Sequence, residues 1–308
     1  MGLLERLGLR KIALSAAKAT ATSAAPASDQ PDGKVTFDID LANVRRMAAH
    51  VPGPLPTAIN GVRFAASIRP RRLVIEGGDD TPVTMPRTVY QLVYPDGTIM
   101  LDAAMDKATH DSFSPDKPEP YDAAAFASIL KALDHASMIV VTHFHADHAG
   151  GIITAFNFGD LAAKTLITTA TARAMIETPH RPHLKLSPEQ IEHFNVVDYD
   201  KYLAVAPGLV LIQAPGHSVD MQMVYIRLAS GREILHSIDA AWNVENIRQL
   251  KGKAAPWVKE DKAQVLAQLH FLNGFMKREP DIVVLVTHDN EQYEHVTAAG
   301  IVGAALEV

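Results

Sequence analysis

Residues 142–151 read Thr-His-Phe-His-Ala-Asp-His-Ala-Gly-Gly, and the five residues before them form the run Ser-Met-Ile-Val-Val. The β-branched residues of that run predict a buried strand, and the paired glycines predict a sharp exit of the backbone after the motif. Three histidines and one aspartate lie within the six positions 143–148. We therefore expect a strand that ends in metal ligands.

The spacing of these ligands predicts two binding points. Side chains two residues apart in an extended segment point the same way, so His143 and His145 face one point. Asp147 and His148 lie beyond the strand end and can face a second point. A surface cluster would explain isolated histidines among the 14 in the chain, but not three in six positions that follow a strand. One segment is therefore expected to supply two adjacent metal ions.

Length and composition limit the classes of protein to consider. With 308 residues, of which 47% are hydrophobic, the chain can bury a full core, and we expect one folded domain at residues 34–308. A net charge of -6 gives no broad basic surface, so binding to nucleic acid is not expected. The chain has no cysteine, so any metal must be held by histidine and carboxylate.

Residues 1–33 form an N-terminal extension that we expect to be flexible or an export signal. It combines basic residues with an Ala/Ser/Thr-rich stretch, but Lys18 interrupts the apolar part and a leucine run is missing. We therefore expect a cytoplasmic protein, with a periplasmic or secreted one as the alternative if the extension is an export signal. No apolar stretch approaches the roughly 20 residues that span a bilayer, so no transmembrane segment is expected.

Alternating strands and helices surround the motif. From the patterns of apolar and turn residues, we expect a helix at 40–48, strands at 72–76, 88–94 and 98–102, a loop at 103–120, and helices at 121–133 and 259–278. Three further apolar runs end on candidate ligands: His217 after 209–213, Asp239 after 233–238, and His288 after 282–286. Collected by position, the ligands are His143, His145 and His217 for one ion, and Asp147, His148 and His288 for the other, with Asp239 between them.

The order of these motifs resembles the metallo-β-lactamase superfamily. The matching parts are the His-x-His-x-Asp-His run, Pro215-Gly216-His217-Ser218, the Asp239 strand end and Thr287-His288-Asp289. The resemblance covers about residues 70–300 and implies an α+β fold, a four-layer αββα sandwich with a two-metal hydrolytic site at one sheet edge. It also implies that Asp102 lies beneath the site and accepts a hydrogen bond from a ligand histidine or from the motif backbone.

Within the superfamily, the chain is most similar to N-acyl homoserine lactone lactonases. The resemblance lies in the spacing from His217 to Asp239 (239 − 217 = 22) and in the residues Ile-Asp-Ala-Ala at that strand end. Those lactonases carry a tyrosine three residues after the bridging aspartate, where this chain has Trp242. An indole N–H can also donate a hydrogen bond, and the residue follows the Asp239 strand end closely, so we expect Trp242 to line the pocket and contact the substrate, with simple core packing as the alternative.

Two divalent ions at such a site can activate a shared hydroxide and polarise a carbonyl, and Asp147 can carry the proton to the leaving oxygen. Zinc is the expected metal, with iron, manganese and cobalt as alternatives. The substrate is expected to be a small molecule, most simply a lactone or related ester, and a homodimer is left open. The alternatives on the same site are phosphotriesters, β-lactams and the thioesters of type II glyoxalases. From other classes, a mononuclear iron dioxygenase or a non-catalytic metal-binding protein is left open.

Other histidines are expected to have other roles. His180 and His183 flank Arg181-Pro182 in a loop and are expected at the surface or at the pocket mouth. His236 is expected to face away from Asp239 and to be packed and hydrogen-bonded.

Overall fold

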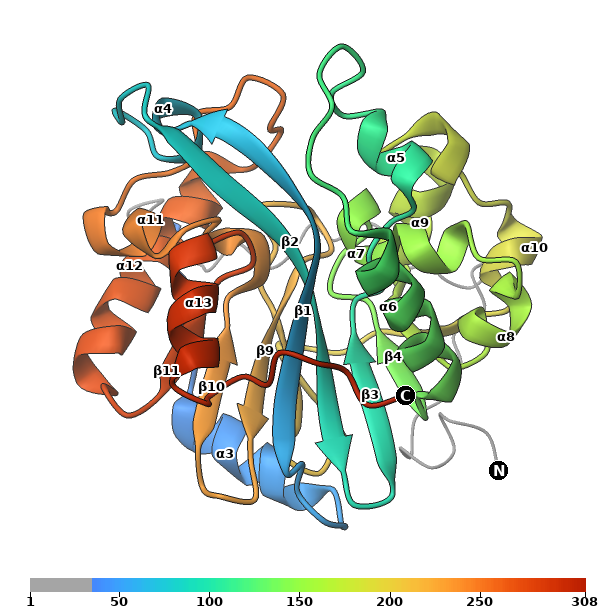
Figure 1. Cartoon of the computed structure of the whole chain (residues 1–308). Helices are drawn as coiled ribbons and strands as arrows, with labels where there is room; N and C mark the ends of the chain where they lie inside the picture. The colour runs from blue at the N-terminus through green and yellow to red at the C-terminus, as the bar shows by residue number, and fades with distance from the viewer. Residues whose placement is uncertain (1–34) are drawn as a thin grey trace.

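Two β-sheets lie face to face with helices on both outer sides, as Figure 1 shows. The computed structural model describes residues 35–308, so the expectation for residues 1–33 concerns a segment outside the described residues. The arrangement confirms the four-layer αββα sandwich. Across residues 35–308, none of the helices has the length and apolar character needed to cross a membrane.

The first sheet has six strands in the order β1-β2-β3-β4-β5-β6. These strands are β1 (Ala58–Pro70), β2 (Pro82–Tyr94), β3 (Gly97–Leu101), β4 (Met138–Val140), β5 (Thr165–Thr168) and β6 (Asn195–Val197). The pairs β1-β2 and β2-β3 are antiparallel, and the pairs from β3 to β6 are parallel. The carboxyl ends of β3 and β4, which precede Asp102 and the histidine motif, therefore lie side by side at one edge.

The second sheet has five strands in the order β11-β10-β9-β8-β7. These strands are β7 (Tyr202–Ala206), β8 (Leu209–Gln213), β9 (Gln222–Arg227), β10 (Glu233–His236) and β11 (Val283–Leu285). Because β9 is antiparallel to both β8 and β10, and β10 is parallel to β11, the strands β8, β10 and β11 run in the same direction. The segments that carry His217, Asp239 and His288 therefore leave the sheet at the same edge.

Helices cover the outer sides of the two sheets (Figure 1). The helices on the side of the first sheet are α5 (Lys107–Asp111), α6 (Ala123–His135), α7 (Ala146–Ile153), α8 (Phe158–Ala162), α9 (Thr169–Glu177) and α10 (Pro188–Ile191), with the short η1 (Pro182–Leu184). Those on the side of the second sheet are α3 (Leu41–His50), α11 (Val244–Gln249), α12 (Lys262–Arg278) and α13 (Asn290–Ala298). The remaining short turns are α4 (Arg71–Val74) and η2 (Ile238–Ala240).

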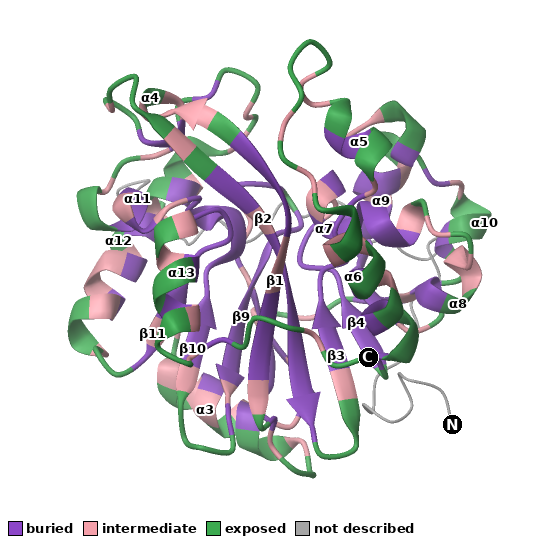
Figure 2. Cartoon of the chain, viewed as in Figure 1, coloured by how far each residue is buried: buried purple, intermediate pink, exposed green. Residues whose placement is uncertain are grey.

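The strands form the buried centre of the molecule, as the burial colours in Figure 2 show. Residues of β4 alternate between two apolar clusters, because successive side chains of a strand face opposite ways. Val140 packs with Leu211 and Leu269 in the cluster that includes the second sheet and α12, whereas Ile139 packs with Leu133 of α6. Each such buried aliphatic side chain contributes about 1.5–3 kcal/mol. The two sheets therefore form a firm support for the edge that carries the site.

Three local expectations are wrong. The Gly150-Gly151 pair does not end the motif segment but lies inside α7, where a Cβ on Gly151 would come within 2.0 Å of the carbonyl oxygen of Ala103. The glycine therefore allows a close approach of helix and loop rather than a turn. Residues 71–74 form the short helix α4 instead of a strand, and the expected loop at 103–120 contains α5.

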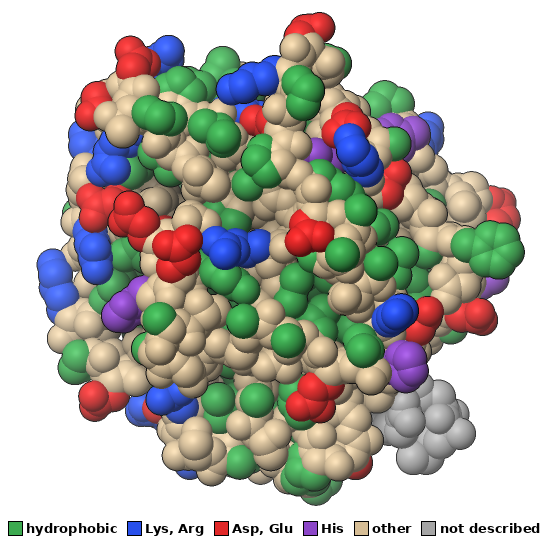
Figure 3. All heavy atoms as spheres, in the orientation of Figure 1, with side chains coloured by type: hydrophobic (Ala, Val, Ile, Leu, Met, Phe, Trp, Pro, Cys, Tyr) green, Lys and Arg blue, Asp and Glu red, His purple; other side chains and the backbone are tan. Residues whose placement is uncertain are grey.

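Charged side chains of both signs are intermingled over the face of the molecule shown in Figure 3. Lys and Arg side chains lie beside Asp and Glu side chains there, and the net charge of the chain is -6. A nucleic-acid backbone is bound by concentrated positive charge. This face therefore carries no concentrated positive charge of that kind.

Candidate metal centre

Seven side chains from separate segments meet where the two sheets share an edge. His143 and His145 follow β4, Asp147 and His148 lie in the first turn of α7, His217 follows β8, Asp239 lies in η2 after β10, and His288 follows β11. These are the seven ligands expected from the sequence, and the structure brings all of them together. The seven side chains meet because they follow strands that end at the same side of the sandwich. These strands are β4 in the first sheet and β8, β10 and β11 in the second.

His143, His145 and His217 form the first of two clusters, which we call the trihistidine group. The Nδ1 atom of His145 lies 3.0 Å from Nε2 of His143 and 3.1 Å from Nε2 of His217. Two nitrogens bound to one tetrahedral zinc ion, each about 2.0–2.1 Å away, lie roughly 3.3 Å apart, which is close to this spacing. Burial lowers the pKa of His143 and of His145 well below the ordinary value, so both imidazoles are neutral and offer lone pairs.

Asp147, His148 and His288 form the second cluster, which we call the mixed group. The Oδ2 atom of Asp147 lies 3.9 Å from Nε2 of His148 and 3.7 Å from Nε2 of His288. One carboxylate and two imidazoles are a common ligand set for zinc. This group therefore offers a second point for a divalent ion.

Asp239 contacts both groups. Its Oδ2 atom lies 3.3 Å from Nε2 of His217 and 3.2 Å from Nε2 of His288, and its Oδ1 atom lies 3.6 Å from Nε2 of His148. The preceding residue, Ile238, has a φ of 51°, a left-handed conformation that is costly for a β-branched residue. The strained turn directs the carboxylate of Asp239 between the two groups.

The unsatisfied atoms of the site indicate that a cation belongs there. Among the described residues, the buried atoms Nε2 of His148 and Oδ1 of Asp239 have no hydrogen-bond partner. Leaving such an atom unpaired costs about 1–3 kcal/mol. Burial lowers the pKa of His148, but the carboxylates of Asp102, Asp147 and Asp239 outweigh burial and raise that pKa to about 10. Positive charge is therefore stabilised at this point, and the donor set of imidazoles and carboxylates fits divalent ions.

Hydrogen bonds on the far side of two ligand histidines direct their Nε2 atoms toward the site. Nδ1 of His148 lies 2.8 Å from Oδ2 of Asp102, and Nδ1 of His288 lies 2.8 Å from the carbonyl oxygen of Pro86. Asp102 also accepts a hydrogen bond of 2.7 Å from the backbone N–H of Thr142, next to the motif. Because an acceptor at Nδ1 holds the proton there, Nε2 keeps its lone pair for a metal.

Three charged residues near the site were not found by sequence reasoning. Arg87, on β2, lies with its Nε 3.5 Å from Oδ2 of Asp147. Lys253 and Glu260 form a buried ion pair of 2.8 Å beside His217. An arginine within the largely apolar strand β2 is a sequence signal for a buried charge. The segment of Lys253 and Glu260 contains no such motif.

Trp242 packs against the carboxylate of Asp239. Its Nε1 donates a hydrogen bond of 3.3 Å to Oδ2 of Asp239, and its ring packs in an apolar cluster with Val74 and Ile75. The residue is 8% exposed, so a small part of the ring is open to a ligand. The N–H group therefore has a partner within the protein, and contact between Trp242 and a substrate stays a prediction.

Two further histidines lie near the ligands without joining them. The ring of His180 stacks on that of His145 at 4.2 Å, and its Nδ1 accepts a hydrogen bond of 3.0 Å from the backbone N–H of Ala146. His236 is buried, faces Tyr90 at 4.8 Å and accepts a hydrogen bond from the backbone of Ile238. The expectation for His236 is therefore confirmed, and His180 covers the trihistidine group.

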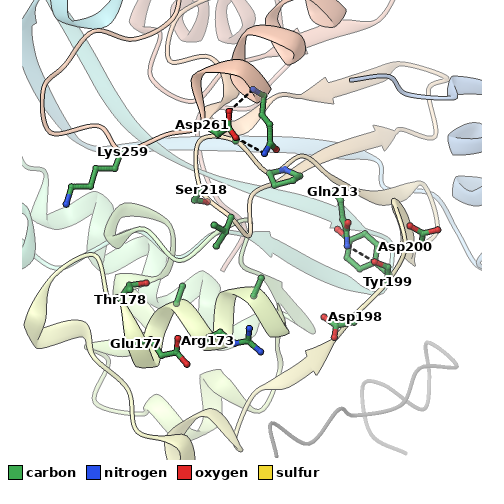
Figure 4. Close-up of a pocket in the computed structure, with 16 residues that line it drawn as sticks. Arg173, Glu177, Thr178, Asp198, Tyr199, Asp200, Gln213, Ser218, Lys259 and Asp261 are labelled. Carbon is green, nitrogen blue, oxygen red and sulfur yellow. Dashed lines mark hydrogen bonds between the residues drawn. The ribbon is translucent and has the colours of Figure 1, made fainter. Parts of the chain in front are cut away.

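A groove of about 1070 Å³ adjoins the loop that carries His217 (Figure 4). It is lined by α9, by the end of β8 and by the start of α12, with cationic and anionic side chains such as Arg173, Glu177 and Lys259. Gly216 and Ser218 line the groove, whereas His217 between them points toward the other histidines. The groove is therefore separated from the metal ligands by one loop.

The chain is similar in sequence to proteins that are named N-acyl homoserine lactonases. No family model matches the chain. The N-acyl homoserine lactonase AiiA of Bacillus thuringiensis subsp. kurstaki is 25% identical over 224 residues, which are 68% of this chain and 84% of the relative. An N-acyl homoserine lactonase of Bacillus cereus is 25% identical over 223 residues, with the same coverage of 68% and 84%.

Solved structures share the fold. The crystal structure of a quorum-quenching N-acyl homoserine lactone hydrolase matches with a TM-score of 0.60 at 22% identity, covering 78% of this chain and 96% of that one. The dizinc quorum-quenching lactonase AidC, in complex with N-hexanoyl-L-homoserine as product, matches with a TM-score of 0.54 at 13% identity, covering 76% and 91%. At these identities the likeness establishes the fold, and the site must be argued from its own residues.

Proposed function

We propose that residues 34–308 form a two-metal hydrolase of the metallo-β-lactamase superfamily that opens a lactone or a related ester. The observation that carries the proposal is the convergence of seven His and Asp side chains at one sheet edge. Curated relatives at 25% identity are named N-acyl homoserine lactonases, which supports a lactone over other acyl substrates.

We assign one divalent ion to the trihistidine group and one to the mixed group, with Asp239 as a ligand to both. Zinc fits best, because neutral imidazole and carboxylate suit it and the chain has no thiolate to offer. Two divalent ions held in this way supply hydroxide near neutral pH and polarise the carbonyl oxygen of a substrate. The other residues of the site then position the ester and transfer one proton.

Proton transfer is assigned to Asp147. In lactone opening, the oxygen of water bonds to the carbonyl carbon, the ring C–O bond breaks, and a proton from that water ends on the leaving alkoxide oxygen. Asp147 and His145 are partly open to solvent, unlike the other members of the two groups, so Asp147 can reach the leaving group. The guanidinium of Arg87, 3.5 Å away, holds the orientation of the Asp147 carboxylate.

Trp242 is assigned to the substrate-facing wall. Its N–H already contacts Oδ2 of Asp239, so the exposed part of the ring offers the substrate an apolar contact. A tyrosine hydroxyl and an indole ring differ in size and in the point to which they extend. We therefore expect the acyl part of the substrate to differ from that of the lactonases with tyrosine.

A hydrolysis screen tests the proposal. Zinc-loaded protein would be assayed on N-hexanoyl homoserine lactone, a simple δ-lactone, an acyl thioester, a phosphotriester and a β-lactam, with His145→Ala as the inactive variant. His135→Ala, at an exposed position on α6, serves as the matched control. We expect a lactone to have the highest kcat/KM. Turnover of another class without any lactone activity would contradict the substrate assignment. Oxygen consumption by a one-iron form would contradict the hydrolase itself.

A further inference from the structure

We propose that Glu260, held by Lys253 in a buried ion pair, positions His217 and so sets the affinity of the trihistidine group for its metal ion. The inference rests on the proposed function in that it assumes a metal at that group. It does not depend on which substrate is hydrolysed. Lys253 and Glu260 are positioning residues, because they act through the ligands that they contact.

The pair is withdrawn from water. Nζ of Lys253 lies 2.8 Å from Oε2 of Glu260, and the two side chains are 1% and 3% exposed. Both residues lie in the coil between α11 and α12. Desolvating two charges carries a cost that a surface pair avoids, and an ion pair is retained in such a place when further contacts use it.

All three N–H groups of the Lys253 ammonium have oxygen acceptors. The Nζ atom lies 2.5 Å from the carbonyl oxygen of Asp239, 2.8 Å from Oε2 of Glu260 and 3.5 Å from the carbonyl oxygen of Ala240. An ammonium has three donors and no acceptor, so these three oxygens can satisfy all of its donors. Lys253 therefore anchors Glu260 to the backbone turn of Asp239 and Ala240.

The same pair selects the tautomer of His217. Nδ1 of His217 lies 3.4 Å from Oε2 of Glu260 and 3.3 Å from Nζ of Lys253. The two neighbours favour opposite tautomers, because a carboxylate accepts a proton from Nδ1 whereas an ammonium donates one to it. A histidine that binds a metal ion through Nε2 carries its proton on Nδ1, so we assign Glu260 as the acceptor of the Nδ1 proton of His217. Nε2 then keeps its lone pair and faces Nδ1 of His145, 3.1 Å away.

The mixed group has other supports. His148 relies on Asp102 after β3, and His288 relies on a backbone carbonyl of β2. Loss of the acceptor at position 260 should therefore weaken the binding of one metal ion and spare the other. If the ion pair only stabilised the fold, its loss would weaken the binding of both metal ions or of neither.

Two double variants that differ only in the side chain at position 260 test this proposal. Lys253→Met with Glu260→Leu removes both charges, so neither partner is left buried and unpaired. Lys253→Met with Glu260→Gln also removes both charges but keeps an oxygen that can accept from Nδ1 of His217. For each full-length zinc-loaded protein, the release of zinc to a competing chelator would be measured together with the melting temperature.

We expect the Leu variant to bind one of its two zinc ions about 10- to 100-fold more weakly, with the second ion unchanged. The Gln variant should stay within a few fold of the wild type for both ions. Equal weakening of both ions, or no weakening in the Leu variant, would overturn the proposal. These outcomes are independent of the substrate screen, so failure here and failure of the lactone assignment can be told apart.

Imidazole nitrogen NMR of the zinc-loaded wild type gives a test that needs no folded variant. The proposal requires a protonated Nδ1 on His217, with a proton shielded from exchange by its bond to Glu260. An Nδ1 of His217 without a proton would overturn the assignment of Glu260 as its acceptor.

Discussion

The trihistidine group and the mixed group offer similar ligands but rest on different parts of the fold. Asp102 and Pro86, which hold the histidines of the mixed group, belong to or directly follow strands of the first sheet. His217 of the trihistidine group follows β8 and depends on Glu260, in the coil before α12. A metal site supported by sheet is more rigid than one supported by coil. From this difference we infer that the affinity for each of the two adjacent ions can be changed separately, although Asp239 contacts both groups.

Asp239→Asn should have the largest effect, because Asp239 is where the two groups meet. The amide keeps the volume of the carboxylate but loses the anionic second donor, so both metal ions lose a ligand. We expect kcat/KM on the best substrate to fall by more than the roughly 10- to 100-fold that follows loss of a supporting residue. The measurement is steady-state kinetics with the metal content of the same sample. Retained turnover with both ions bound would show that Asp239 does not join the groups.

Asp102→Asn should affect the mixed group alone. Asparagine tolerates the left-handed backbone at this position, where φ is 66°, so the turn is kept while the charged acceptor for Nδ1 of His148 is lost. We expect the zinc ion of the mixed group to bind roughly 10- to 100-fold more weakly and the other ion to be unchanged. Chelator competition measures both ions. Weakening of the trihistidine group instead would reverse the assignment of supports.

Trp242 variants should have a smaller effect on activity. Trp242→Phe removes the hydrogen bond to Asp239, which is worth about 0.5–1.5 kcal/mol, so kcat/KM should fall by roughly two- to tenfold. Trp242→Ala deletes a largely buried aromatic side chain and should cost about 3–5 kcal/mol in the free energy of unfolding. Kinetics and chemical denaturation measure the two effects. Unchanged kcat and KM in the Phe variant would exclude a role for the N–H group, and unchanged kinetic constants in the Ala variant would exclude the apolar contact as well.

Much of the fold and of the site could be predicted from the sequence, because these features depend on residues close together in the chain. The histidine motif, the strand-end ligands and the helix caps depend on neighbours in the chain. Asp40 caps α3, and Ser187 with Gln190 forms a capping box at the start of α10. The order of the motifs, through the resemblance that it carries, also implied the four-layer fold.

The parts that could not be predicted depend on contacts between distant segments. Gly151 was interpreted as a turn residue, because its close contact with Ala103 forms only after the loop beyond β3 packs on α7. Lys253 and Glu260 have no local signal, since their partner His217 is 36 residues from Lys253 along the chain. Tertiary contacts of this kind are outside the reach of periodicity and spacing.

The most direct test of the account is the metal content of the purified chain. Protein prepared in metal-replete buffer would be analysed by elemental analysis, alongside His288→Ala and the exposed-site control His135→Ala. The account predicts close to two divalent ions per chain in the wild type and control, and close to one in His288→Ala, because seven ligands exceed what one tetrahedral ion can use. A content that stays at one ion per chain in the metal-replete wild type would contradict it.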